Sequence, residues 1–228
     1  MSRISYDAAH MRITVDDTEV RKALGDLSSK TPAVMKVAVN RTAREARKLM
    51  IKSAQKRYDL SAKGKEKVKG LKQRGKATNA NPAAELFIGG GSFGVRNDLA
   101  YFRTDPKEPF MGHRVWSAPK YFRARVLKKS AMKNLTGKGN LSKGFLVQFK
   151  SGHIGMVQRV AGTKGPDYTQ KGLPRWQPSN KLQTMGAPSA VAMHRTVWKD
   201  VEPDVETILE ESLERRIQQI LAKAKGAT

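Results

Sequence analysis

Positive charge is concentrated in two segments of this 228-residue chain, and any fold that it adopts must keep both segments on the surface. The chain has 44 Lys and Arg against 20 Asp and Glu, a formal net charge of +24. Residues 36–76 contain fifteen basic and three acidic residues, and residues 103–143 contain eleven basic and two acidic residues. Because like charges at this density repel one another, the pattern predicts a macromolecular partner that is a polyanion or has an acidic surface.

Composition limits the size of the core and the kind of site. Hydrophobic residues make up 39% of the chain and the mean hydropathy is −0.57, so we expect a modest core and segments that become ordered on assembly. The chain has no cysteine, which excludes disulfides and thiol chemistry and is typical of a reducing cytoplasm. No segment has the apolar run of a membrane helix, and the first ten residues lack the apolar core of a secretory signal, so we expect a soluble protein without membrane contact.

Two long helices are predicted. Thr31 and Pro32 are suited to the N-cap and first turn of a helix over residues 32–57, which would be about 40 Å long. Its apolar face has residues three or four apart: Val34, Ala38, Thr42, Ala46, Leu49 and Ser53. Helical spacing returns over residues 190–198 and again after Pro203, where a helix over residues 203–224 is acidic early and basic late.

Alternating apolar residues predict several short strands. Residues 11–15 predict a strand followed by a weak helix, and further strands are predicted at 84–88, 121–127, 144–150 and 153–161. The last two flank Ser151 and Gly152, which suit a two-residue hairpin turn. That turn would place Phe149 opposite Ile154, with Val147 opposite Met156 and Phe145 opposite Gln158.

Two segments lack the pattern of either element. Residues 61–82 are rich in lysine, glycine and asparagine, and predict a flexible basic arm. Residues 162–188 form a long Gly/Pro-rich loop, in which Trp176 and Pro188 are candidate partner contacts. The chain is therefore predicted to have an α+β fold: a small antiparallel β-sheet packed with a long basic N-terminal helix and a C-terminal amphipathic helix, with long extended loops. Its expected organisation is an N-terminal segment of residues 1–30 and a single domain of residues 31–228.

Residues able to carry catalysis are sparse. The four histidines lie far apart without a second ligand at metal spacing, which predicts surface or hairpin positions. Residues 89–94 are glycine-rich but lack the Lys-Ser or Lys-Thr pair of a phosphate-binding loop. We therefore expect no catalytic residue, no metal and no cofactor.

The candidate functional residues are basic side chains that would face DNA or an acidic protein surface. Only one aromatic residue, Tyr58, lies in the first basic segment, which favours phosphate contact over base recognition. The candidates are Arg41, Arg44, Arg47, Lys48, Lys52, Lys56, Arg57, Lys63, Lys65, Lys67, Lys69, Arg123 and Arg125.

The hairpin sequence FLVQFKSGH, followed by MVQRVAG over residues 156–162, resembles the minor tail protein Z family of long-tailed bacteriophages. The resemblance extends to the basic helix at residues 40–43, to the turn at residues 186–189 and to the closing helix from Pro203, and covers about half of the chain. The residues of the hairpin region that carry the resemblance are Phe145, Phe149, Gly152, Gln158, Arg159 and Gly162.

Members of that family are tail completion proteins. The resemblance implies a noncatalytic virion protein that is added at the head-proximal end of the tail in the host cytoplasm, helps to form the head-tail junction and supports DNA delivery. It also implies a ring of identical subunits, contacts with the tail terminator and the head-tail connector, and exposure to DNA passing through the neck. The main alternative is a basic protein that binds nucleic-acid phosphates without sequence specificity, and an enzyme acting on nucleic acid ranks last.

Overall fold

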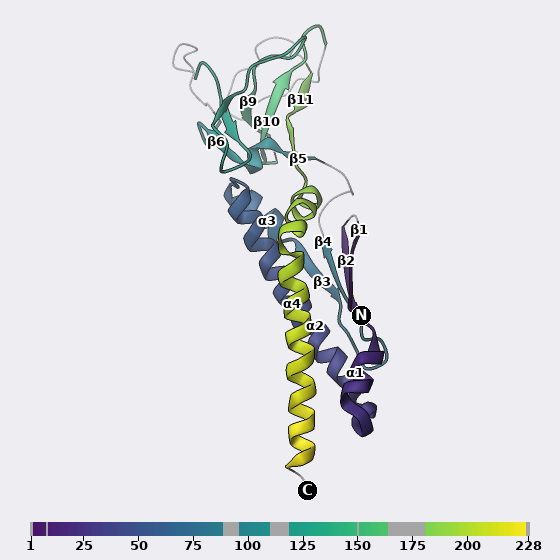
Figure 1. The fold of residues 1–228 in the computed structure, drawn as a ribbon. Coiled ribbons are helices and arrows are strands. Elements are labelled where there is room, and N and C mark those ends of the chain that lie inside the picture. Colours follow the sequence, from purple (N-terminus) through teal and green to yellow (C-terminus); the bar gives the residue numbers. More distant parts are fainter. Residues whose placement is uncertain are drawn as a thin grey trace. The chain divides into compact units, whose positions relative to one another are not determined.

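The computed structural model describes residues 2–7, 9–88, 96–109, 119–149, 151–163 and 181–226. The fold is α+β, with two long helices and small antiparallel sheets (Figure 1). The chain divides into two compact units. The first unit comprises Met1–Ala54, Lys67–Gly94 and Ala190–Thr228, and the second comprises Gln55–Glu66 and Val95–Ser189. Residues 95–189 form sheets of their own, and the N-terminal segment that the sequence sets apart belongs to the first unit.

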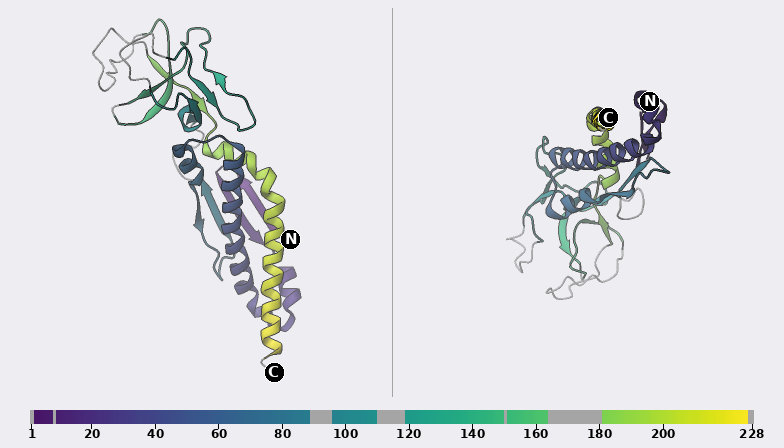
Figure 2. Two further views of the ribbon diagram at one scale, coloured as in Figure 1. Left: turned by 90° about the vertical axis from the view of Figure 1, so that its left-hand side faces the viewer. Right: turned by 90° about the horizontal axis from the view of Figure 1, so that it is seen from below.

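The first unit is a four-stranded antiparallel sheet covered by helices. Its strands follow the order β1-β2-β4-β3, and its elements are β1 (Ser2–Asp7), β2 (His10–Val15), α1 (Asp17–Leu24), the 3-10 helix η1 (Gly25–Lys30), α2 (Thr31–Arg57), β3 (Leu71–Gly75), β4 (Ala84–Ile88) and α4 (Ala190–Lys225). Helices α2 and α4 lie side by side over one face of this sheet and run in opposite directions (Figure 1, Figure 2). This two-layer arrangement buries one face of the sheet.

The strands of this sheet follow the alternation in the sequence. Met11 and Ile13 of β2 are buried while Arg12 between them is exposed, which confirms the predicted strand. Strand β4 coincides with the predicted range 84–88, and α1 is the expected short helix, capped by the Asp16 side chain that accepts a hydrogen bond from the Thr18 N–H. Strand β1 was not predicted because Ile4 and Tyr6 are its only large apolar residues.

Helix α2 confirms the predicted helix but not its cap. The chain enters α2 directly from η1, so Thr31 already has helical dihedral angles and its hydroxyl is buried without a hydrogen-bond partner. The buried face is wider than predicted: Leu49 and Ser53 are only half-buried, but ten other residues of the helix are buried. The buried residues of α2 are Thr31, Val34, Met35, Ala38, Val39, Thr42, Ala43, Ala46, Met50 and Ala54. A helix that contacts both a sheet and a neighbouring helix needs such a broad apolar face.

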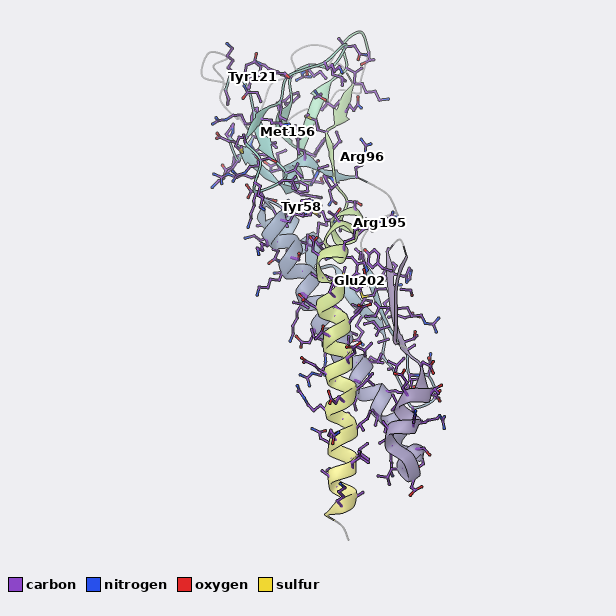
Figure 3. The ribbon with its side chains drawn as sticks, in the orientation of Figure 1. Tyr58, Arg96, Tyr121, Met156, Arg195 and Glu202 are labelled. Carbon is purple, nitrogen blue, oxygen red and sulfur yellow. The ribbon has the colours of Figure 1, made fainter. Side chains whose placement is uncertain are left out.

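Helix α4 continues without a break through Pro203, where the sequence predicts the start of a separate helix. Proline removes one backbone hydrogen bond from a helix interior, but Val201 and Val205 are both buried, so packing on either side of it holds the helix together. Arg195 and Glu202 mark the segment that precedes the proline (Figure 3).

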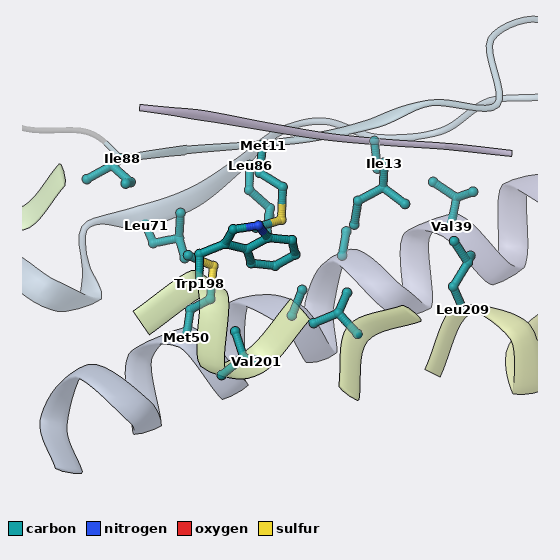
Figure 4. Packing of buried hydrophobic residues seen from close by; sticks show 14 of the residues in the cluster. Met11, Ile13, Val39, Met50, Leu71, Leu86, Ile88, Trp198, Val201 and Leu209 are labelled. Atoms are coloured by element: carbon teal, nitrogen blue, oxygen red, sulfur yellow. The ribbon is translucent and has the colours of Figure 1, made fainter. Parts of the chain in front are cut away.

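The core of the first unit lies between the sheet and the two long helices (Figure 4). Trp198 of α4 packs in one cluster with Met11, Leu86 and Met50, and the Tyr6 ring stacks on the Trp198 ring with centroids 5.8 Å apart. Burial raises the pKa of Tyr6 to about 12. Each fully buried side chain of this size stabilises the fold by about 1.5–3 kcal/mol, so this cluster is the main source of stability in the unit.

The prediction of a flexible arm over residues 61–82 is wrong. Helix α3 (Ala62–Lys69) and strand β3 occupy much of it, and Val68 and Leu71 are buried. Two apolar residues are too few to indicate order by pattern alone, but both are fully buried in the folded protein, and Leu71 packs in the core of the first unit. Tertiary contacts therefore decide the structure of this segment.

The second unit contains three small antiparallel sheets. The strand orders are β11-β10-β9, β12-β5 and β6-β7-β8, and the elements are β5 (Asn97–Asp98), η2 (Leu99–Tyr101), β6 (Arg103–Asp105), β7 (Arg123–Arg125), β8 (Lys133–Asn134), β9 (Phe145–Gln148), β10 (Ile154–Arg159), β11 (Leu182–Thr184) and β12 (Gly186–Ala187). The strands predicted near 121–127, 144–150 and 153–161 are confirmed with narrower bounds. Most of the predicted loop over residues 162–188 lies outside the described residues, and its end forms β11 and β12.

The predicted register of the β9-β10 hairpin is wrong by one residue. Gln148 pairs with Ile154 and Leu146 pairs with Met156. The Phe149 N–H donates to the His153 carbonyl (2.8 Å), so three residues separate the strands instead of two, and Gly152 at the end of this loop has a φ of 77°. A three-residue loop that ends in the left-handed region is a common hairpin form. Consecutive residues are buried in both strands, Leu146 and Val147 in β9 and Met156 and Val157 in β10, so apolar side chains are buried on both faces of the hairpin.

Candidate partner-binding surface

The solvent-facing side of helix α2 is basic. Arg44, Lys48 and Lys52 are exposed and four residues apart, so their side chains lie along one face of the helix, and Arg41 on the same face is partly exposed. Lys48 pairs with Glu45 at 2.8 Å. Within the part of the chain that the structure describes, Arg41, Arg44 and Lys52 have no acidic partner. These side chains are available to an outside anion.

Arg47 was predicted to face a partner, but its guanidinium is used inside the first unit. Its Nε donates to the Leu71 carbonyl (2.6 Å), and a terminal nitrogen lies 3.4 Å from the Lys69 carbonyl. Asn40, two helical turns earlier on α2, donates to the Ala77 carbonyl (2.9 Å) and accepts from the Ala77 N–H (3.0 Å). These two side chains fasten the segment that contains β3 to helix α2.

The remaining candidate residues of the first segment are exposed on α3 and at the end of α2. They are Lys56, Arg57, Lys63, Lys65, Lys67 and Lys69. Helix α3 has no acidic residue in its first turn, and Gly64 is buried against the Tyr101 carbonyl, where an added Cβ would clash. The lysines on either side of Gly64 therefore extend into solvent while the glycine makes the contact.

Arg123 and Arg125 are engaged in ion pairs within the second unit. The Arg125 Nε donates to Asp59 Oδ2 at 2.6 Å, with side chains only 24% and 15% exposed. Arg123 pairs with Asp105, and both side chains are about half exposed. Of the two arginines that were predicted to face a partner, Arg125 is thus mainly structural. Removing one member of a largely buried ion pair leaves the other charge uncompensated and destabilises the fold.

The residues that carry the family resemblance mostly hold the hairpin and its flanks. The Gln158 Nε2 donates to the Ser142 carbonyl (2.9 Å), and the Arg159 guanidinium lies 5.1 Å from the centre of the Phe145 ring. The Phe149 ring stacks on His153 with centroids 5.8 Å apart. Gly152 and Gly162 have φ values of 77° and 75°, which favour glycine.

The sequence did not single out Asp98, which organises the second unit. Its Oδ1 accepts from the N–H groups of Ala100 and Met156, both at 2.9 Å, and its Oδ2 lies 3.4 Å from His153 Nε2. A Cβ on Gly155 would lie 2.7 Å from the same carboxylate oxygen. An Asp before a helical turn is a known cap signal, but nothing in the sequence indicates the second contact, 58 residues away.

The prediction that the histidines occupy surface or hairpin positions is wrong for His194. This residue of α4 is fully buried, and its Nε2 donates to the Val68 carbonyl at 2.9 Å while Nδ1 has no partner. Desolvation lowers the pKa of His194 and outweighs the opposing effect of its hydrogen bond. The neutral ring therefore joins α4 to the end of α3.

The two predicted loop contacts are only partly described. The Pro188 carbonyl accepts a hydrogen bond from Asn97 Nδ2 (2.9 Å), and Trp176 lies outside the described residues. Across the described ranges, no three His, Asp or Glu side chains converge as they would around a metal ion. None of the described helices combines the length and apolarity needed to cross a bilayer.

Comparisons with known protein families, with curated proteins and with solved structures find no match to this chain.

Proposed function

We propose that this chain is a structural protein of a long-tailed bacteriophage, a tail completion protein at the head-proximal end of the tail. The observation that supports the proposal is the segment Phe145 to Gly162, which resembles the minor tail protein Z family and forms one continuous structural feature, the β9-β10 hairpin with its flanks. The protein would form part of the neck that joins head to tail and would support DNA delivery.

The charge distribution fits a structural protein that binds neighbouring proteins in an assembly. A face of α2 and the lysines of α3 are exposed and basic, while the side chains of the hairpin are engaged in packing within the second unit. Partners in this proposal are further copies of the chain in a ring, the tail terminator and the head-tail connector, with DNA passing nearby. Such contacts need positioned charge and shape more than reactive groups.

An experiment on particles tests the proposal directly. A label fused to the C-terminus, after α4, is located in averaged images of purified virions. The proposal predicts label at the junction between head and tail. Label distributed along the tail shaft, or found only on nucleoids of infected cells, would contradict it.

A second candidate function is nonspecific binding of nucleic acid through phosphates, which the exposed Arg44, Lys52 and Lys63 favour. Salt dependence separates the two functions. A dedicated binder would lose affinity steeply with salt, with a log-log slope of about −0.9 for each phosphate neutralised. A tail protein is expected to bind duplex DNA weakly and to sediment with tails.

A further inference from the structure

Helix α4 presents an acidic face to solvent. Its stretch from Glu202 to Glu214 contains six acidic residues and no basic residue. Five of the six are exposed and Glu202, at the start of the stretch in Figure 3, is partly exposed. The acidic residues are Glu202, Asp204, Glu206, Glu210, Glu211 and Glu214. We call this surface the acidic α4 face.

Helix α2 presents the opposite charge beside it. Between Arg41 and Lys52 there are five basic residues and one acidic residue, Glu45. We call the surface formed by Arg41, Arg44, Lys48 and Lys52 the basic α2 face. Both helices belong to the first unit and lie in the same layer over its sheet (Figure 1, Figure 2).

The two faces overlap along part of this layer. Val39, Leu209, Met50 and Trp198 belong to one buried cluster. Figure 4 shows Val39 of α2 near Leu209 of α4 at one end of the cluster, and Met50 of α2 near Trp198 of α4 toward the other end.

With a rise of about 1.5 Å per residue, the basic face is roughly 16 Å long and the acidic face roughly 18 Å long. Because the two helices are antiparallel, Glu206 lies near the level of Arg41, while Glu214 lies beyond that end of the basic face, where Leu213 packs near Val34 and Met35. The two faces therefore overlap over part of their lengths.

The charges of the two faces are not paired with each other inside the chain. Among the described residues, no ion pair joins α2 to α4, and the pair made by Lys48 is with Glu45 of its own helix. Glu206, Glu210 and Glu214 have no basic partner within the described ranges. Two adjacent strips of opposite sign are thus left open to solvent.

We propose that this surface binds a second copy of the same chain, with the basic α2 face of one copy against the acidic α4 face of the other. A polyanion such as DNA would be attracted by α2 but repelled by the six carboxylates beside it, and a purely basic partner would meet the reverse conflict. A partner must carry both charges next to each other at the same spacing, and another copy of the chain does so.

The contact depends on charge more than on apolar burial. Val37 is an exposed large apolar residue on this side of α2, with 41% of its surface accessible to solvent. Exposed ion pairs are individually weak and are screened by salt, so the association sets the register between copies and weakens as ionic strength rises. The inference rests on the part of the proposed function that has the chain assembling with its own copies.

Charge reversal tests the contact by sedimentation velocity on nuclease-treated, full-length protein. The α2 variant carries Arg44→Glu, Lys48→Glu and Lys52→Glu, and the α4 variant carries Glu206→Lys, Glu210→Lys and Glu214→Lys. Each variant alone is expected to self-associate at least tenfold more weakly than the unmodified chain at low salt. An equimolar mixture of the two variants is expected to restore association, because every contact then joins opposite charges.

The matched control reverses Lys63 and Lys65 on α3, which changes net charge without touching either face and is expected to leave association unchanged. Circular dichroism confirms that all variants are folded, and rescue in the mixture excludes misfolding as the cause of any loss. The proposal is overturned if the unmodified chain stays monomeric, if single variants associate normally, or if the mixture is not rescued. Loss of DNA binding in the α2 variant with unchanged association would identify a polyanion site instead. None of these outcomes depends on where the protein lies in a virion, so the proposed function is tested separately.

Discussion

One carboxylate, that of Asp98, connects three parts of the second unit. It caps the turn η2, accepts the buried N–H of Met156 in β10 and faces the His153 ring. Gly155 leaves the space that the carboxylate occupies. The side chain is therefore explained by structure, and no reactive role is needed to account for it.

Replacing Asp98 by alanine is expected to destabilise the second unit by about 1–3 kcal/mol, because the buried Met156 N–H would lose its acceptor. Asp98→Asn keeps an oxygen in place of Oδ1 and is expected to cost much less. Urea denaturation of the two variants and the unmodified protein measures the difference. Equal stability of the alanine and asparagine variants would contradict this role.

His194 is expected to make the first unit sensitive to mild acid. Its pKa is lowered in the folded protein, so below the ordinary histidine pKa of about 6.5 the unfolded chain takes up a proton that the folded chain does not. Stability is therefore complete above that pH and falls as the pH drops, by at most about 1.4 kcal/mol per pH unit.

His194→Gln keeps a side-chain N–H near the Val68 carbonyl but does not titrate. Unfolding of the first unit, followed by amide hydrogen exchange in α4 at pH 7.5 and 5.5, is expected to show a smaller pH effect in this variant. An unchanged pH dependence would show that other groups are responsible.

At the scale of elements, β3 and the segment after it are held by side chains of α2. Asn40 makes two hydrogen bonds to the backbone of Ala77 and accepts a third from Gln73 (3.1 Å), while Arg47 bonds the Leu71 carbonyl. Local sequence preference for β structure is weak here, so these bonds determine where the strand lies.

Asn40→Ala is expected to lower stability by about 1–2 kcal/mol and to raise hydrogen exchange across residues 71–77. Arg44→Ala, on the exposed side of the same helix, is the matched control and is expected to leave exchange there unchanged. Similar exchange in both variants would mean that the segment is ordered by its own contacts.

Elements with strong periodicity were predictable and those determined by distant contacts were not. The helix over residues 32–57 and the strand over 84–88 follow from apolar spacing alone. The hairpin register failed because Ser151 and Gly152 suit a two-residue turn equally well, and the choice depends on the burial of both hairpin faces. The continuity of α4 through Pro203 likewise depends on packing on either side of the proline.

For the whole molecule, the division into two units could not be read from the sequence. The first unit combines three separate segments of the chain. Its core depends on contacts between Trp198 and residues far away in the sequence, such as Met11 and Leu86. The basic candidates were found by composition, but composition could not distinguish Arg44, which is exposed, from Arg47 and Arg125, which are occupied within the chain.

If this chain is a structural part of a phage particle, as we propose, quantitative mass spectrometry of virions purified to homogeneity will detect it. Peptides from both units are expected at a constant, small number of copies per particle, retained after nuclease treatment and high-salt washing. Purified, infectious particles without this polypeptide would overturn the proposal.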